Sequence, residues 1–109
     1  MTNIQVLRNL CNAICNTFYP DVAVLQLSLF NEGIGSDDEA TPKDATLLRL
    51  AIRLVKGYVE NSKSENGISH SVDADRINES IAMWCNDYGL DVDEYLISRV
   101  TIESGSNLW

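Results

Sequence analysis

Cysteine and histidine are the side chains of this sequence best suited to bind a metal ion. The chain contains three cysteines, Cys11, Cys15 and Cys85, and a single histidine, His70. Three thiolates and one imidazole form a ligand set that tetrahedral zinc accepts. However, Cys11 and Cys15 stand one helical turn apart among apolar residues, whereas zinc ligands usually come in pairs across a turn. Because cysteine is often buried as a small apolar side chain, we expect three reduced thiols in the core and no bound cofactor.

The histidine is also the natural candidate for a general base. Asp73 or Asp75 could orient its ring, but its two neighbours are serines that belong to no nucleophile motif. The glycines at 33 and 35 lack the third glycine of a nucleotide-binding loop. These patterns favour a histidine in a surface loop, and they predict that the protein is not an enzyme.

Three consecutive carboxylates, Asp37, Asp38 and Glu39, could bind a cation. They lack the alternating oxygen ligands, the turn glycine and the closing glutamate of a calcium loop. We therefore expect a solvated loop that leads into a helix, and we keep the three residues as candidates for contact with a partner.

The composition predicts a single domain over residues 1–109. This length suffices for one core, and a hydrophobic fraction of 45% is ordinary for a globular protein. No stretch approaches a membrane-spanning length, and the first residues lack a secretory signal, so we expect a cytoplasmic protein without a membrane partner. The formal charge of −8 opposes tight binding of nucleic acid and suits a basic protein partner.

The strongest helical pattern covers about residues 42–60. Its polar positions, Arg49, Arg53, Lys56 and Glu60, fall on one narrow stripe of a helix. A helix that is apolar over most of its circumference must be buried on most of it, so we expect a central helix with other elements packed around it. The apolar positions are Leu47, Leu48, Leu50, Ala51, Ile52, Leu54, Val55, Tyr58 and Val59.

This central helix also carries a start signal and a candidate interaction surface. Thr41 is expected as its N-cap, with Pro42 at the first helical position and Asp44 at the third, as in a capping box. The three basic residues of its polar stripe either face water, or contact the acidic surface of a neighbouring subunit or a nucleic acid.

Two shorter helical patterns precede the central helix. The first covers about 3–18 and can be capped by Thr2 or Asn3. The second, over 21–30, alternates in part like a strand. The glycine and isoleucine that follow it are typical of a helix C-terminus, so we expect a short helix there.

Beyond the central helix, residues 61–67 contain no apolar side chain and predict a loop, and 68–72 predicts a short extended segment. A further helix, capped by Asp73 or Asp75, ends at another glycine. The run 95–102 fits a last helical turn followed by a strand, or an extended arm. Together these patterns predict a mainly α fold, a small bundle of four to five helices. The apolar face of the last helix consists of Ile77, Ile81, Trp84, Cys85 and Tyr88.

The C-terminal stretch 103–109 is polar except for Leu108 and Trp109 at its end. A large aromatic side chain at the end of a polar arm is a common docking device. The tail either docks on a partner or packs back onto its own chain, and both residues are candidates for an interaction.

A series of short motifs follows one order along the chain: Phe18-Tyr-Pro-Asp21, Asn31-Glu-Gly-Ile-Gly35, Asp37-Asp-Glu-Ala-Thr-Pro42, the helix Leu47–Val59, Glu65-Asn-Gly-Ile-Ser-His-Ser-Val72, Trp84-Cys-Asn-Asp-Tyr-Gly-Leu90 and a tail closing on Trp109. Over residues 18–109 this order resembles the head–tail connector proteins, also called neck or adaptor proteins, of bacteriophages and prophages. The run 95–102 departs from the family's pattern.

The resemblance implies a small helical structural protein that forms a ring below the phage portal. Its partners would be further copies of itself and the portal and tail proteins, and the family brings no catalytic residues. An acidic lumen would let DNA pass without sticking. The protein would reside in the bacterial cytoplasm during assembly, and in the virion of an active phage. The alternative is a small acidic cytoplasmic module that binds or regulates a basic protein.

Overall fold

The computed structural model describes the backbone of residues 1–66 and 74–97. The expected extended segment 68–72 and the tail 103–109 lie outside these residues, as does most of the run 95–102. In the described chain the fold is mainly helical, as predicted, and two residues form an isolated β-bridge. The elements in chain order are α1 (Asn3–Ile14), α2 (Val22–Asn31), α3 (Ala45–Asn66), α4 (Ala74–Tyr88) and a 3₁₀ turn η1 (Val92–Glu94).

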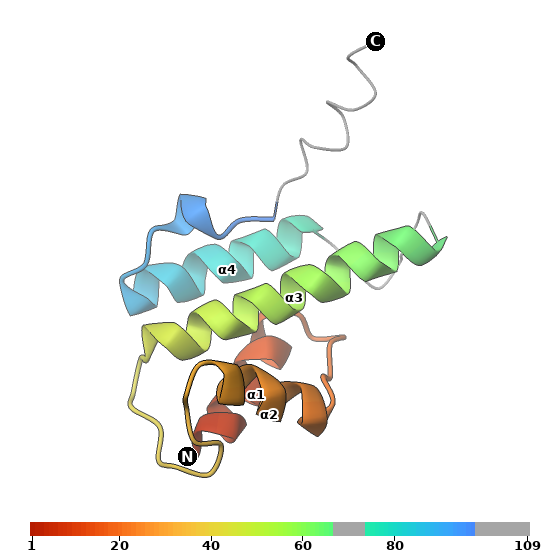
Figure 1. Cartoon of the computed structure of the whole chain (residues 1–109). Helices are drawn as coiled ribbons and strands as arrows, with labels where there is room; N and C mark the ends of the chain where they lie inside the picture. Colours follow the sequence, from red (N-terminus) through yellow and green to blue (C-terminus); the bar gives the residue numbers. More distant parts are fainter. Residues whose placement is uncertain (67–73, 98–109) are drawn as a thin grey trace.

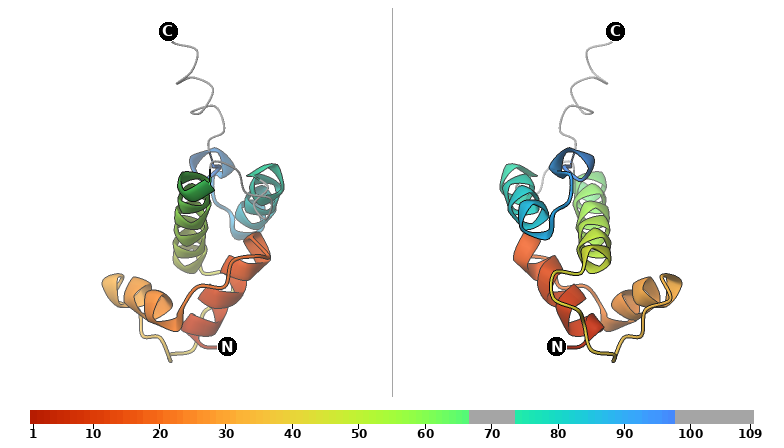
Figure 2. Two further views of the ribbon diagram at one scale, coloured as in Figure 1. Left: turned by 90° about the vertical axis from the view of Figure 1, so that its right-hand side faces the viewer. Right: turned by 90° about the vertical axis from the view of Figure 1, so that its left-hand side faces the viewer.

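The helices form a small bundle in which α3 and α4 lie side by side above α1 and α2 (Figure 1). α1 contacts each of the other three helices, and η1 contacts α4. Figure 2 shows α2 on one flank and α4 on the other, with α1 and α3 between them. None of the described helices combines the length and the apolarity needed to cross a lipid bilayer.

The core forms around the apolar surface of α3, as its sequence predicts. Arg49 and Arg53 lie on the exposed side of this helix, while its apolar positions are buried or partly buried. Burial of these side chains is the main force that holds the helices together. The buried apolar residues of the core are Leu47, Leu48, Leu50, Ala51, Ile52, Val55 and Val59 of α3, Leu7, Leu10, Cys11 and Ile14 of α1, Leu25 and Leu29 of α2, Ile77, Ile81 and Cys85 of α4, and also Cys15 and Ile97.

The start of α1 is held by its own cap and by the acidic loop. Thr2 Oγ1 accepts a hydrogen bond from Gln5 N at 3.4 Å, and Gln5 Oε1 accepts one from Thr2 N at 3.0 Å, which completes a capping box. The loop carbonyls of Asp38 and Ser36 accept from the backbone N–H groups of Asn3 and Ile4, respectively. The orphan donors of this helix terminus are therefore satisfied.

The prediction that Thr41 caps the central helix is wrong. Lys43 adopts a left-handed backbone with φ of 57°, so the chain turns before the helix begins. Asp44 is the cap instead, since its Oδ1 accepts a hydrogen bond from Thr46 N at 2.9 Å. The capping box that was expected at Thr41 and Pro42 does not form.

Two helix ends differ from the sequence expectations. α1 stops at Ile14, because Cys15 is extended and the chain then turns so that Phe18 stacks on Tyr58 with ring centroids 4.7 Å apart. α3 continues to Asn66, so residues 61–66 are not the expected loop. A helix that has already nucleated can extend through polar residues, because each added residue gains one hydrogen bond.

The glycine stops that end α2 and α4 are confirmed. Gly33 and Gly89 have positive φ angles of 72° and 76°. Ile34 N donates to Leu29 O at 2.9 Å, and Leu90 N donates to Cys85 O at 2.8 Å, so each chain folds back over the last helical turn.

The segment after η1 is fastened to both long helices. Asn78 on α4 donates to Ile97 O at 3.0 Å and accepts from Ile97 N at 2.7 Å. Arg49 Nε on α3 donates to Tyr95 Oη at 3.0 Å. Residues 95–97 therefore close the bundle over the α3–α4 pair.

Candidate functional site

The three cysteines lie in the core as free thiols, as predicted. Burial raises the pKa of Cys11 from 9.0 to about 12, and the nearby Cys15 adds to this rise. Burial also raises the pKa of Cys85. Within residues 1–66 and 74–97 no group of three or more His, Cys, Asp and Glu side chains could hold a metal ion, and His70 lies outside these ranges.

The acidic residues Asp37, Asp38 and Glu39 are exposed on the loop that covers the start of α1. Glu39 Oε2 lies 3.0 Å from the N-terminal amine of Met1. Negative charge at this position suits the positive end of the α1 dipole. The loop therefore has a structural role at α1, and its contact with a partner stays a prediction.

Two residues of the predicted basic stripe contact their own chain. Arg49 donates a hydrogen bond to Tyr95, as described above. Nη1 of Arg53 lies 3.9 Å from Oε2 of Glu32, at the end of α2. Lys56 is partly buried on the same helix. The first two side chains thus link α3 to the C-terminal segment and to α2, and a partner contact through the stripe stays a prediction.

A broad exposed apolar surface lies on α2, and the sequence pattern did not predict it. This helix buries Leu25 and Leu29, whereas Val22, Leu27 and Phe30 are 51%, 59% and 78% exposed. Ala23, Leu27 and Phe30 follow helical spacing, so they form one face directed away from the core. We call this surface the α2 face. A helix that is apolar on every side normally has neighbours on every side, and α2 leaves one side uncovered.

A second apolar surface lies across α1 and α4. It is a groove of about 450 Å³, and its floor comes from Leu10 and Ala13 of α1, Pro42 of the loop, and Trp84 and Tyr88 of α4. We call it the α1–α4 groove. The two aromatic rings meet edge to face with centroids 6.0 Å apart, so the α4 side of the groove is preformed.

Charged groups lie along the rim of this groove. Lys43 Nζ pairs with Asp87 Oδ1 at 3.2 Å, and the amine of Met1 pairs with Glu39. The indole N–H of Trp84 is covered and has no hydrogen-bond acceptor among the described residues. A buried hydrogen-bond donor without an acceptor lowers the stability of the fold by roughly 1–3 kcal/mol. Here this cost arises at Trp84 on α4.

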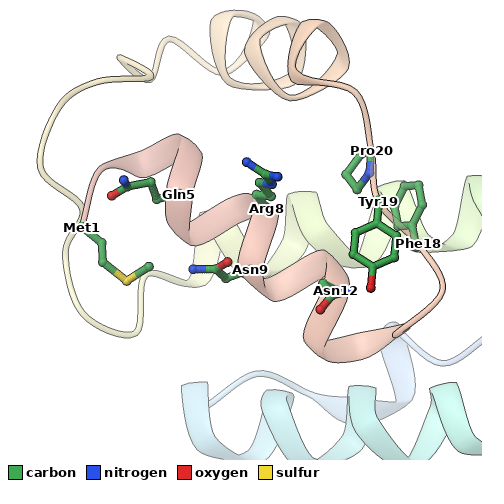
Figure 3. A pocket seen from close by; sticks show the side chains of 8 residues that line it. All are labelled: Met1, Gln5, Arg8, Asn9, Asn12, Phe18, Tyr19 and Pro20. Atoms are coloured by element: carbon green, nitrogen blue, oxygen red, sulfur yellow. The ribbon is translucent and has the colours of Figure 1, made fainter.

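A third depression is polar and has a volume of about 550 Å³. Figure 3 shows Gln5, Arg8 and Asn12 projecting from α1, and the ring of Tyr19 opposite Asn12. Amide and guanidinium groups on an exposed helix face suit hydrogen bonds to polar groups. Phe18, Tyr19 and Pro20 add apolar area beside these polar groups, so the lining of this depression is mixed.

The whole chain, residues 1–109, matches the model of DUF6706, a family of unknown function. The chain belongs to the DUF6706 family. No curated protein and no solved structure matches it.

In this DUF6706 protein, the two apolar surfaces are formed by different helices, α2 for one and α1 with α4 for the other. α2 is on one side of the bundle, and α4, which forms one wall of the groove, is on the other (Figure 2). Both surfaces are built on helices that the core holds in place, so both are preorganised. The arrangement suits the binding of a macromolecule at two separate places.

Proposed function

We propose that this protein is a non-enzymatic structural subunit that assembles with copies of itself into a ring, as a head–tail connector or head-completion adaptor of a phage or prophage. The observation that carries the proposal is the exposed apolar face of α2, where Phe30 is 78% exposed. A contiguous apolar patch of this kind on a small protein usually marks an interaction surface.

Burial of the α2 face would contribute favourable energy to assembly. Phe30 alone presents roughly 150 Å² of surface, as is typical for an exposed aromatic side chain. Burying a Phe or Leu side chain yields about 1.5–3 kcal/mol, so the α2 face supplies several kcal/mol per contact. Two such contacts per subunit in a ring would hold each copy on both sides.

The order of the motifs and the charge of the chain support a phage connector in particular. The motifs between Phe18 and Trp109 run in the order found in that family, and the described part of the chain folds as helices. A charge of −8 per subunit would line a ring lumen with negative potential, through which DNA could slide. The portal and tail proteins would then be the further partners, and assembly would take place in the bacterial cytoplasm.

The test is to replace Phe30 with Asp and to follow assembly of the full chain by sedimentation and by electron microscopy of the particles. We expect wild-type protein to form closed rings as concentration rises. Phe30→Asp should weaken self-association at least tenfold, because about 1.4 kcal/mol of lost burial corresponds to a factor of ten.

Asn31→Asp is the matched control, since Asn31 is also exposed on α2 and the substitution adds the same charge without removing apolar surface. It should assemble nearly as wild type does. Wild-type protein that stays monomeric at high concentration, both alone and with a portal protein, would contradict the proposal and favour the acidic binding module. Portal and capsid genes beside this one would support the phage assignment.

A further inference from the structure

We infer that the α1–α4 groove of one subunit receives the α2 face of the next subunit. This inference rests on the proposed self-assembly and identifies the two surfaces that meet. It makes the contact heterologous, with Leu27 and Phe30 of one copy seated against Ala13, Pro42 and Trp84 of its neighbour.

The placement of the two surfaces favours this pairing. α2 and α4 lie on opposite flanks of the bundle (Figure 2). When two different patches on opposite sides of a subunit bind each other, each added copy presents the same free patch again. The chain of contacts then closes into a ring or continues as a filament. Pairing of one α2 face with another α2 face would instead stop at a dimer.

The shape and chemistry of the surfaces also match. The largest side chains of the α2 face, Leu27 and Phe30, are 59% and 78% exposed and stand about one turn apart on a helix. The groove is concave, has a volume of about 450 Å³ and is floored by apolar and aromatic side chains. A cavity of this size accommodates a ligand as large as a typical drug molecule, and hence two such side chains.

The charges at the edges do not oppose this pairing. The segment from Asp21 to Glu32 carries two carboxylates at its ends and no basic residue. The rim of the groove holds two cations, Lys43 and the amine of Met1, each already paired with one carboxylate. On a chain with a charge of −8, this neutral rim is a place where an acidic helix meets little repulsion.

The test uses a groove variant, Ala13→Glu, beside the α2 variant Phe30→Asp. Ala13 is exposed on α1, so a larger side chain fits without disturbing the core, and the added carboxylate repels the acidic α2 segment. We expect self-association to weaken at least tenfold. Gln5→Glu is the control, because it adds the same charge to α1 outside the groove and keeps a side chain that completes the capping box.

Mixing the two variants gives the decisive result. Ala13→Glu retains an intact α2 face and Phe30→Asp retains an intact groove, so an equimolar mixture can form one good junction. We expect each variant alone to be monomeric and the mixture to form a heterodimer that grows no further. Circular dichroism and thermal unfolding verify that both variants fold, and Thr41→Glu, at another exposed position of the groove, serves if Ala13→Glu does not.

The remaining outcomes separate this inference from the proposed function. If wild-type protein assembles but Ala13→Glu assembles equally well, the groove is not the acceptor and this inference fails. If the mixture stays monomeric while wild-type protein forms rings, the α2 face and the groove do not meet. If wild-type protein never assembles, the proposed function fails as well.

Discussion

At the scale of single residues, the buried thiol of Cys11 shows how position in the fold sets chemistry. The Cys11 side chain lies on the inner face of α1 and is fully buried. Burial raises the pKa of its thiol to about 12. A thiol with so high a pKa is neutral at physiological pH and is a poor nucleophile and metal ligand. Cys11 therefore acts as an apolar core residue.

The pKa of Cys11 leads to a prediction about stability at alkaline pH. The folded state keeps its proton up to about pH 12, whereas the unfolded thiol loses its proton near 9.0. Stability from this group is therefore complete below pH 9 and falls as pH rises further, with a slope approaching about 1.4 kcal/mol per pH unit. We expect Cys11→Ala to have a shallower alkaline decline in urea unfolding measured across this range.

Cys85→Ala is the comparison for this measurement. Burial also raises the pKa values of Cys85 and Tyr88, so these groups contribute their own shares to the decline in every variant that retains them. An alkaline slope that is equally steep in Cys11→Ala and in the wild-type protein would show that the Cys11 thiol ionises freely in the folded state.

At the scale of the elements, two glycines have opposite roles. Gly57 lies inside α3, and a methyl group added there would meet no atom within 4 Å. Gly33 ends α2 with a φ of 72°, a backbone conformation that favours glycine. No feature of the structure requires glycine at position 57. The turn after α2 requires glycine at position 33 because of its positive φ angle.

These roles predict opposite effects of the same substitution. Gly57→Ala should raise the free energy of unfolding by about 0.5–1 kcal/mol, because alanine loses less backbone entropy in a helix. Gly33→Ala should lower it by roughly 1–2 kcal/mol, because the left-handed conformation becomes strained. Urea denaturation of the two variants gives both values, and a shift of the same sign in each would refute this assignment.

At the scale of the whole molecule, the bundle is closed by contacts between its distant parts. The N-terminus joins the acidic loop through Met1, and residues 95–97 join α4 through Asn78. Both contacts involve hydrogen bonds between segments that are far apart in the sequence. The first contact lies at the α1–α4 groove, which Met1 and Glu39 help to line, and the second ties residues 95–97 to α4.

The Asn78 contact gives a prediction for the whole fold. Asn78→Ala removes both hydrogen bonds to Ile97 and leaves partly buried backbone groups unpaired, so the free energy of unfolding should fall by about 1–3 kcal/mol. Asn86→Ala, at an exposed position of the same helix, should change stability little. Equal stability of the two variants in thermal unfolding would show that the Ile97 contact contributes nothing.

The helices and most of the core could be predicted from periodicity, because the spacing of apolar residues specifies a buried face. The ends of α2 and α4 could be predicted too, since Gly33 and Gly89 act within one helical turn. Of the helix boundaries that were predicted wrongly, the end of α1 involves a contact distant in the sequence, whereas the start of α3 involves a local one. α1 stops early so that Phe18 reaches Tyr58, and Asp44 displaces Thr41 as the cap of α3.

The sequence by itself determined that this protein is a helical bundle with buried thiols and an acidic surface, because those properties follow from residue types and their local spacing. Only the tertiary structure decided which apolar residues remain exposed. Leu25 and Phe30 are equally apolar in the sequence, yet one is fully buried and the other is 78% exposed. The difference arises because α1 packs against only one side of α2, and the other side stays exposed.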